Sequence, residues 1–264
     1  MFAPDPKTTW HSVGHILGHT VLVYDRIDST STRCADFAND PANHGLVIVA
    51  DSQTAGRGQH GRSWMSEPGM GLWLSVLLFP PTDLCRPAVL TAWAAVSVCR
   101  WLQTTAGIDA ELKWPNDVLI AGQKICGILI EQNQAVVVGI GLNLNHSQES
   151  LQSAGLPGAT SLFAVTGKTY ATTESAQSFV AELDRTYQDI CDNGLSGLET
   201  EWKTRFGLIG KEIVIEELEQ TNSGRLLDMT FDAVVWENEE GHPELVMPEK
   251  IRHLYGTEGK AKNA

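Results

Sequence analysis

The sequence predicts an α+β protein: a mixed, largely antiparallel sheet flanked by helices, with a small all-β unit at the C-terminal end. Two observations predict this fold class. Strand patterns at residues 118–120, 125–131 and 135–144 follow one another across turns of a few residues. Such turns join antiparallel strands, because a parallel connection needs a dozen residues or more. After Gly210 the chain contains only short strand patterns separated by turns.

The elements before these strands are shorter strands and one long helix. β-branched and aliphatic runs predict strands at residues 21–24, 46–50 and 71–79, and Pro80-Pro81 closes the third. Pro87 then opens a helix to about residue 105, because proline is tolerated at the first helical position, and Gly107 ends it.

The elements after these strands divide the chain. Residues 146–160 are polar and rich in Gly, Pro and Ser, and are expected to form a loop. Helices are predicted near 173–191 and 195–206. Strands at 213–215, 224–229, 231–236, 245–247 and 251–254, with turns at 222–224 and 239–241, predict a small β-barrel. We therefore expect a domain of residues 1–208 and a second of residues 209–264 that ends in a short frayed tail.

Composition limits the partners. The chain has 264 residues, of which 42% are hydrophobic and 19% charged, with a formal net charge of −13. This predicts a folded protein and disfavours binding to nucleic acid or to anionic membranes. The five cysteines contain no C-x-x-C pair, and we see neither a secretory signal nor an apolar run of membrane-spanning length, so a soluble, cytoplasmic protein is expected. A polyanionic ligand would have to be held by a few local cations.

A glycine–arginine loop is one place where those cations gather. Its glycines match G-x-G-x-x-G, but Pro68 and Gly69 leave no helix after them, which argues against a dinucleotide site. What remains is a loop in which Arg57 and Arg62 offer forked donors to phosphate or carboxylate. A solvated surface loop is the alternative. The glycines are Gly56, Gly58 and Gly61.

Two further segments carry chemistry. Pro115 stiffens the segment Lys113–Asp117, where a carboxylate beside an amide suits hydrated Mg²⁺. Lys124 follows the next turn and either points into the same site or forms an ordinary ion pair with Asp117. In the last of the three strands, glycines indicate a close approach by a ligand or backbone, and Asn143 and Asn145 alternate onto one face where a ligand would satisfy them.

Taken together, five segments resemble the motifs of biotin protein ligases. The distinctive pair is the loop Gln53–Trp64, similar to G-R-G-R-x-G-R-x-W, and Lys113–Asp117, which reads K-W-P-N-D. Residues 28–31 resemble D-S-T-N, Lys124–Glu131 resembles K-x-x-G-I-L-x-E, and Gly139–Asn145 resembles G-I-G-x-N. Residues 210–255 are more loosely similar to the family's C-terminal SH3-like domain.

The resemblance implies a fold akin to class II aminoacyl-tRNA synthetases and a reaction in two steps. Biotin and ATP would form biotinyl-5′-AMP with the help of Mg²⁺, and a lysine of a biotin carboxyl carrier protein would then receive the biotin. The sequence itself leaves the oligomeric state open, and a sheet edge could pair two protomers as a homodimer.

The resemblance also implies roles for individual residues. Lys124, Arg57 and Asp117 would be catalytic, and Asp117 would bind Mg²⁺. The biotin site would comprise Ser29, Thr30, Ser31, Gln53, Gly56, Arg57, Gly58, Gln59, Trp64, Lys124, Gly127, Gly139 and Gly141. The nucleotide site would comprise Arg57, Gln59, Arg62, Lys113, Asn116, Asp117, Lys124 and Asn143.

Two positions depart from the family pattern. The second arginine of G-R-G-R is Gln59 here, which suggests a looser hold on the adenylate. Ser31 replaces an asparagine and keeps a donor and an acceptor, so its effect should be small.

Two rival functions remain. A lipoate or octanoate protein ligase or transferase of the same fold would bind an acyl chain, for which Ser29, Thr30 and Gln53 are too polar. A biotin-sensing DNA-binding repressor would need a helix-turn-helix domain before residue 28, where we expect no room for one.

Overall fold

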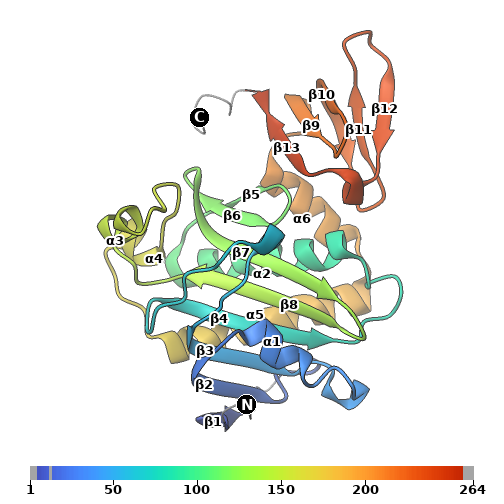
Figure 1. Ribbon diagram of the computed structural model, residues 1–264. Coiled ribbons are helices and arrows are strands. Elements are labelled where there is room, and N and C mark those ends of the chain that lie inside the picture. Colours follow the sequence, from blue (N-terminus) through green and yellow to red (C-terminus); the bar gives the residue numbers. More distant parts are fainter. Residues whose placement is uncertain (1–4, 12–13, 258–264) are drawn as a thin grey trace.

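The computed structural model describes residues 5–11 and 14–257 and contains two β-sheets (Figure 1). The larger sheet has the strand order β1-β2-β3-β4-β8-β7-β6-β5. Strands β2 and β3 run parallel, and every other neighbouring pair in this sheet is antiparallel. The predicted mixed, largely antiparallel sheet is therefore confirmed. Its strands are β1 (Thr8–Trp10), β2 (Val21–Ile27), β3 (Val47–Gln53), β4 (Gly71–Leu78), β5 (Glu111–Lys113), β6 (Asp117–Ile120), β7 (Gln123–Gln132) and β8 (Val136–Asn143).

Side-chain alternation along these strands builds a core on each face of the sheet. On one face, Val47 and Val49 belong to the large core that includes α2 (Pro87–Ala106) and α5 (Thr172–Asn193). On the other, Ile48 and Ala50 belong to a smaller core with Cys34 of α1 (Thr30–Ala35). Figure 1 shows α2 and α5 behind the sheet and α1 in front of it. Because α1 covers only part of its face, it leaves open sheet beside it.

The long helix α2 begins and ends where the sequence predicted. Pro87 occupies its first turn, and Gly107 ends it in the left-handed conformation with φ 68°. The helix is buried against α5, where Trp93 donates its indole N–H to Thr186 at 3.0 Å. No helix in the described ranges is both long and apolar enough to cross a membrane.

The second sheet is antiparallel, with the order β12-β11-β10-β9-β13, and α6 (Ser196–Phe206) leads into it. It is fastened to the rest of the molecule by Trp114. The Trp114 ring lies 6.1 Å from that of Trp202, and its N–H donates to the carbonyl of Ile251 at 3.1 Å. Its strands are β9 (Glu212–Glu216), β10 (Thr221–Met229), β11 (Val234–Glu237), β12 (Pro243–Val246) and β13 (His253–Gly256).

Three sequence predictions need correction or limitation. The turn predicted at residues 222–224 is wrong, because these residues lie in β10 and pair with β9, and pairing overrides their turn-like composition. The loop 146–160 contains α3 (Gln148–Ser153), capped by Ser147, and α4 (Leu162–Thr166) follows it. The frayed tail predicted at the C-terminal end falls mostly on 258–264, outside the described residues.

Candidate active site

A cavity of about 470 Å³ lies over the open sheet face. It brings together segments that are far apart in sequence: the start of α1, the glycine–arginine loop, the segment 113–117, strands β7 and β8, and β13 of the second sheet. All but one of the residues predicted for biotin, nucleotide or metal line it, namely Ser29, Thr30, Ser31, Gln53, Arg57, Gly58, Gln59, Arg62, Trp64, Lys113, Asn116, Asp117, Lys124, Gly127, Gly139, Gly141 and Asn143.

The exception is Gly56, which is buried beneath the loop. A Cβ atom at this position would lie 2.5 Å from the carbonyl oxygen of Trp64. The backbone N–H of Trp64 donates to the carbonyl of Gly56 at 2.9 Å. Gly56 therefore lets the two arms of the loop approach each other, and does not itself face the cavity.

One wall of the cavity is a connected chain of polar side chains. The carbonyl oxygen of the Gln53 side chain accepts from the backbone N–H of Thr30 at 2.7 Å and from its hydroxyl at 3.1 Å. Ser75 donates to the Thr30 hydroxyl at 2.8 Å and lies 3.1 Å from the hydroxyl of Ser31. On the other side, Gln53 donates to Ser66 at 2.8 Å. These bonds fix the orientations of the Gln53, Thr30 and Ser31 side chains.

The glycines of β7 and β8 make room for Trp64. Gly127 and Gly141 are directly paired across the two strands. A Cβ atom would lie 2.7 Å from the Trp64 ring at Gly127 and 2.5 Å from it at Gly141. The indole therefore lies directly on the sheet, with its N–H buried and without a hydrogen-bond partner in the described residues. Any larger residue at either position would displace it.

Lys124 and Asp117 meet inside the cavity. Their ammonium and carboxylate groups are 2.5 Å apart, with 34% and 19% of the two side chains exposed. The Lys124 ammonium also lies 5.1 Å from the centre of the Trp64 ring. Both alternatives left open by the sequence are thus realised at once, because the two residues form an ion pair and that pair faces the cavity.

The loop after β8 holds Lys124 by its backbone. The N–H of Lys124 donates to the carbonyl of Gly158 at 2.8 Å, and its carbonyl accepts from Thr160 at 2.9 Å. The side chain of Asn143 donates to the carbonyl of Thr160 at 3.0 Å. The loop after β8 and the start of β7 are therefore joined by hydrogen bonds into one unit.

Asn145 does not belong to this site. Its side chain donates to the carbonyls of Gly69 and Tyr170, at 2.8 Å and 2.9 Å, and accepts from the N–H of Tyr170. The expectation that a ligand would satisfy both asparagines is wrong for Asn145, because β8 ends at Asn143 and the alternation ends with it.

The cations around the cavity fall into two groups. Lys124 and Arg57 are each paired with a carboxylate, and the pair between Arg57 and Glu131 of β7 measures 2.8 Å. Within residues 5–11 and 14–257, no ion pair is formed by the other three cations that line the cavity, which are Lys113, Arg62 and Arg252. An anionic ligand therefore meets an excess of positive charge.

Sequence reasoning missed several residues of this site. Ser75 had a visible signal, since it is a polar residue inside the otherwise apolar strand β4. Arg252 and His253 had none, because they come from the second sheet, more than a hundred residues beyond the last recognised motif. Leu156 and Ala159 come from the loop that was left without assigned contacts.

Cys126 lies in β7, two residues after Lys124, but has no part in the chemistry. The thiol is fully buried, and burial raises its pKa far above the ordinary value. A thiol that stays protonated is a poor nucleophile, which agrees with its interpretation as a core residue.

The fold and the cavity together define an α+β protein with a cation-lined cavity that suits a small anionic molecule held against the sheet. Comparison with known proteins identifies the family. The model of the Biotin/lipoate A/B protein ligase family matches residues 23–145. The chain is 33% identical over 233 residues to the bifunctional ligase/repressor BirA of Bacillus spizizenii, covering 86% of this chain and 72% of that protein.

Two further relatives agree. The biotin–[acetyl-CoA-carboxylase] ligase of Paracoccus denitrificans is 32% identical over 201 residues, which cover 72% of this chain and 82% of that protein. The biotin protein ligase from Aquifex aeolicus in complex with biotin and ATP superposes with a TM-score of 0.75 at 26% identity, over 90% of this chain and 99% of that one. The chain therefore belongs to the biotin/lipoate A/B protein ligase family.

Proposed function

We propose that this chain is a biotin–protein ligase. It activates biotin with ATP as biotinyl-5′-AMP and transfers the biotin to a lysine of a biotin carboxyl carrier protein. The observation that carries the proposal is a single cavity in which Lys124, beside Asp117 and Trp64, stands near the polar wall built on Thr30 and Gln53. One end of the cavity suits an anion and the other suits a neutral, hydrogen-bonding ring.

The first step joins two anions. A carboxylate oxygen of biotin attacks the α-phosphorus of ATP, forming a C–O–P linkage, and pyrophosphate leaves with the electrons of the broken P–O bond. Two like charges 4 Å apart repel by about 4 kcal/mol at an effective dielectric of 20. Lys124 and Arg57 offset this repulsion and stabilise the charge that grows on the α-phosphoryl oxygens.

Both cations already have a carboxylate partner. Lys124 is paired with Asp117 and Arg57 with Glu131, at 2.5 Å and 2.8 Å. The biotin carboxylate and the α-phosphate then compete with these two carboxylates for the same donors. In the second step, the amine of the acceptor lysine attacks the carbonyl carbon of the mixed anhydride, and AMP leaves as an amide forms.

The polar wall favours biotin over an acyl chain such as lipoate. Ser29 precedes α1 without capping it, so its hydroxyl is available in the cavity beside Thr30. An acyl chain placed here would leave the buried Ser29 hydroxyl without a partner, at a cost of about 1–3 kcal/mol. The ureido group of biotin offers both donors and acceptors to it.

The experiment that tests this function is ATP–pyrophosphate exchange, with biotin and lipoate supplied separately as the acid. We expect exchange that depends on biotin and rates at background with lipoate. Exchange that depends on lipoate and is indifferent to biotin would contradict the proposal.

Asp117 and Asn116 would hold the Mg²⁺ that accompanies ATP. In the described part of the chain, no group of three or more His, Cys, Asp or Glu side chains could enclose a metal, and Asp117 is the one carboxylate that lines the cavity. This donor set suits an ion that keeps most of its waters and takes one or two protein ligands. The ion would reduce the charge of the triphosphate.

Two finer structural assignments belong to the same proposal. The second sheet would be an SH3-like barrel that follows a class II aminoacyl-tRNA synthetase-like domain, with the boundary near residue 208. The end of α6 at Phe206 and the start of β9 at Glu212 support this boundary.

Gln59 should make the adenylate easier to lose. Where relatives have an arginine, this side chain lines the cavity without a charge. Restoring the charge in Gln59→Arg should slow release of biotinyl-5′-AMP about fivefold, because charge-assisted hydrogen bonds are roughly twice as strong as neutral ones. Release is measured by chasing preformed labelled adenylate with unlabelled biotin, and equal rates for the two proteins would reject the idea.

A further inference from the structure

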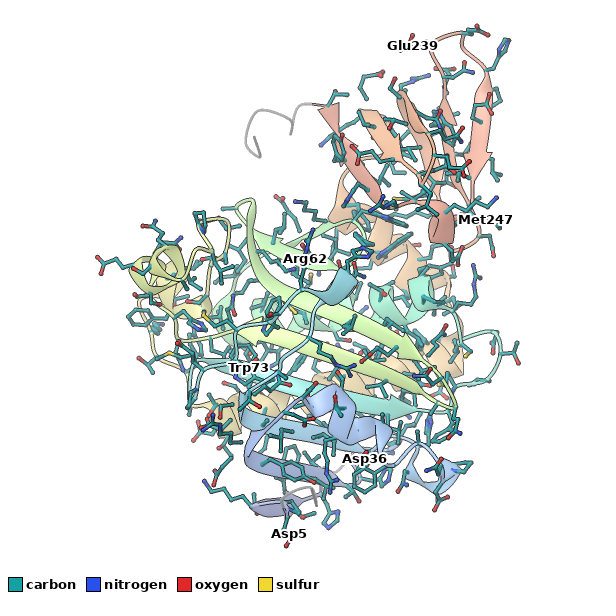
Figure 2. The ribbon with its side chains drawn as sticks, in the orientation of Figure 1. Asp5, Asp36, Arg62, Trp73, Glu239 and Met247 are labelled. Atoms are coloured by element: carbon teal, nitrogen blue, oxygen red, sulfur yellow. The ribbon has the colours of Figure 1, made fainter. Side chains whose placement is uncertain are left out.

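The tip of the glycine–arginine loop, residues 57–63, is tied to the large sheet by a single hydrogen bond of the described chain. The other hydrogen bonds of the tip stay inside the loop, such as that from the N–H of Gly58 to the carbonyl of Arg62 at 2.8 Å. The exception is Arg57, whose Nη2 atom donates to Oε2 of Glu131 at 2.8 Å. Figure 2 shows Arg62 of the tip in front of the large sheet. Whatever holds the tip in place therefore acts through Arg57 or through the residues at either end of the loop.

Glu131 holds Arg57 from just outside the cavity. It lies on β7, where side-chain alternation places it on the same face as Gly127 and Leu129. Those two residues and Arg57 line the cavity, whereas Glu131 does not. The backbone of Glu131 is fixed in turn, because it pairs with Val137 of β8. The ion pair thus joins a cation of the cavity to a carboxylate on a rigid strand beyond its edge.

This contact leaves most of the Arg57 guanidinium unused. Arginine carries five N–H donors on three nitrogen atoms. Of these atoms, Nη2 is bonded to Glu131, while Nε and Nη1 form no hydrogen bond within the described ranges. An anion in the cavity therefore competes with Glu131 only at Nη2 and finds the other two nitrogens free. Arg57 is able to contact a ligand while Glu131 keeps the guanidinium in place.

The loop tip has no second ionic tie to the sheet. Gln59, which stands where the family pattern has an arginine, carries no charge, and Arg62 forms no ion pair in residues 5–11 and 14–257. The pair of Arg57 and Glu131 has 41% and 28% of its side chains exposed. A pair this exposed is weak and is screened by salt. The hold on the tip is therefore easily broken and easily perturbed.

We propose that Glu131 is a positioning residue of the ligase reaction, which holds Arg57 and the loop tip against β7 and so slows the escape of biotinyl-5′-AMP. This inference rests on the proposed ligase function. Glu131 touches neither substrate and acts through the Arg57 guanidinium.

The test is the release of synthetic labelled biotinyl-5′-AMP from Glu131→Gln, chased with unlabelled adenylate, which needs neither ATP nor carrier protein. We expect release about fivefold faster than from the parent, the upper end for loss of a partly exposed ion pair. Glu237→Gln is the matched control. It removes the partner of Arg225 from an ion pair of the same length, 2.8 Å, outside the cavity, and should release adenylate at the parent rate.

Three further readouts separate positioning from a merely structural role. The ratio of the Glu131→Gln rate to the parent rate should fall towards one as salt rises, because salt screens the ion pair in the parent. Glu131→Asp keeps the charge and should release at a rate between the two. In the double variant with Arg57→Gln, loss of Glu131 should add little, because Glu131 acts only through Arg57.

Equal release from Glu131→Gln and the parent would overturn the proposal. Slower release would overturn it too, since Glu131 would then only compete with the adenylate for Arg57. A rate ratio that ignores salt, or full additivity with Arg57→Gln, would show that Glu131 acts through the fold and not through the ion pair. If instead the parent did not bind biotinyl-5′-AMP, the ligase function itself would fail, and this result is distinguishable because it does not depend on Glu131.

Discussion

Lys124→Ala should lower the rate of biotinyl-5′-AMP formation by about a hundredfold to a thousandfold, the range for losing one donor aimed at developing negative charge. The side chain is the one cation in the described structure that contacts both Asp117 and the Trp64 ring, at 2.5 Å and 5.1 Å. No other cavity cation lies within ion-pair distance of Asp117 in these residues, so none replaces it. The measurement is adenylate formed per enzyme in a single turnover without carrier.

Two controls separate chemistry from folding. Lys124 is fixed in the fold by backbone hydrogen bonds to Gly158 and Thr160, and these bonds do not involve its side chain. The variant should therefore keep a cooperative thermal transition. Lys168→Ala removes an exposed lysine outside the cavity and should leave the rate unchanged. If the Lys124→Ala protein formed adenylate at the parent rate, Lys124 would not be a catalytic residue.

Gly141→Ala should weaken biotin binding by about tenfold to a hundredfold. Its new Cβ atom would lie 2.5 Å from the Trp64 indole, which real contacts do not allow, so the ring must leave the sheet. Overpacking of this kind costs about 1–3 kcal/mol, and about 1.4 kcal/mol corresponds to tenfold in affinity. The Kd for biotin, measured by calorimetry, reports the change directly.

Gly197→Ala is the matched control for this substitution. Its Cβ atom would meet no atom within 4 Å in the described structure, and alanine favours the helix α6 in which it lies. Its biotin affinity should equal that of the parent. An unchanged Kd in Gly141→Ala would mean that the position of Trp64 on the sheet has no bearing on the ligand.

Much of the fold was predictable because the hydrophobic periodicity agrees over long stretches with the Gly and Pro residues that begin and end helices and strands. Helix α2 runs from a proline to a left-handed glycine, and both signals are local. The strands β6, β7 and β8 are joined by short turns, and such turns allow only antiparallel pairing of consecutive strands. The site residues were predictable for another reason, because Lys113–Asp117 and the loop around Arg57 resemble known motifs.

What was missed depended on tertiary contacts. Helix α1 begins at Thr30, the last residue of the D-S-T segment. Its six residues carry no amphipathic repeat, and it is stabilised by packing on β3, β4 and β8. The turn expected at residues 222–224 is a strand because these residues pair with β9. Arg252 lines the cavity from a segment that Trp114 and Glu216 hold by hydrogen bonds, and no local pattern encodes these contacts.

The most direct test of the central claim is a crystal structure of the protein with biotinyl-5′-AMP. We expect the adenylate to occupy the cavity, with its phosphate in contact with Lys124 and Arg57 and its ureido ring against Thr30 and Gln53. The Arg57 guanidinium, which lies 2.8 Å from the Glu131 carboxylate, should then contact the phosphate. An adenylate bound elsewhere, or one that leaves Lys124 without a contact to its phosphate, would contradict the account.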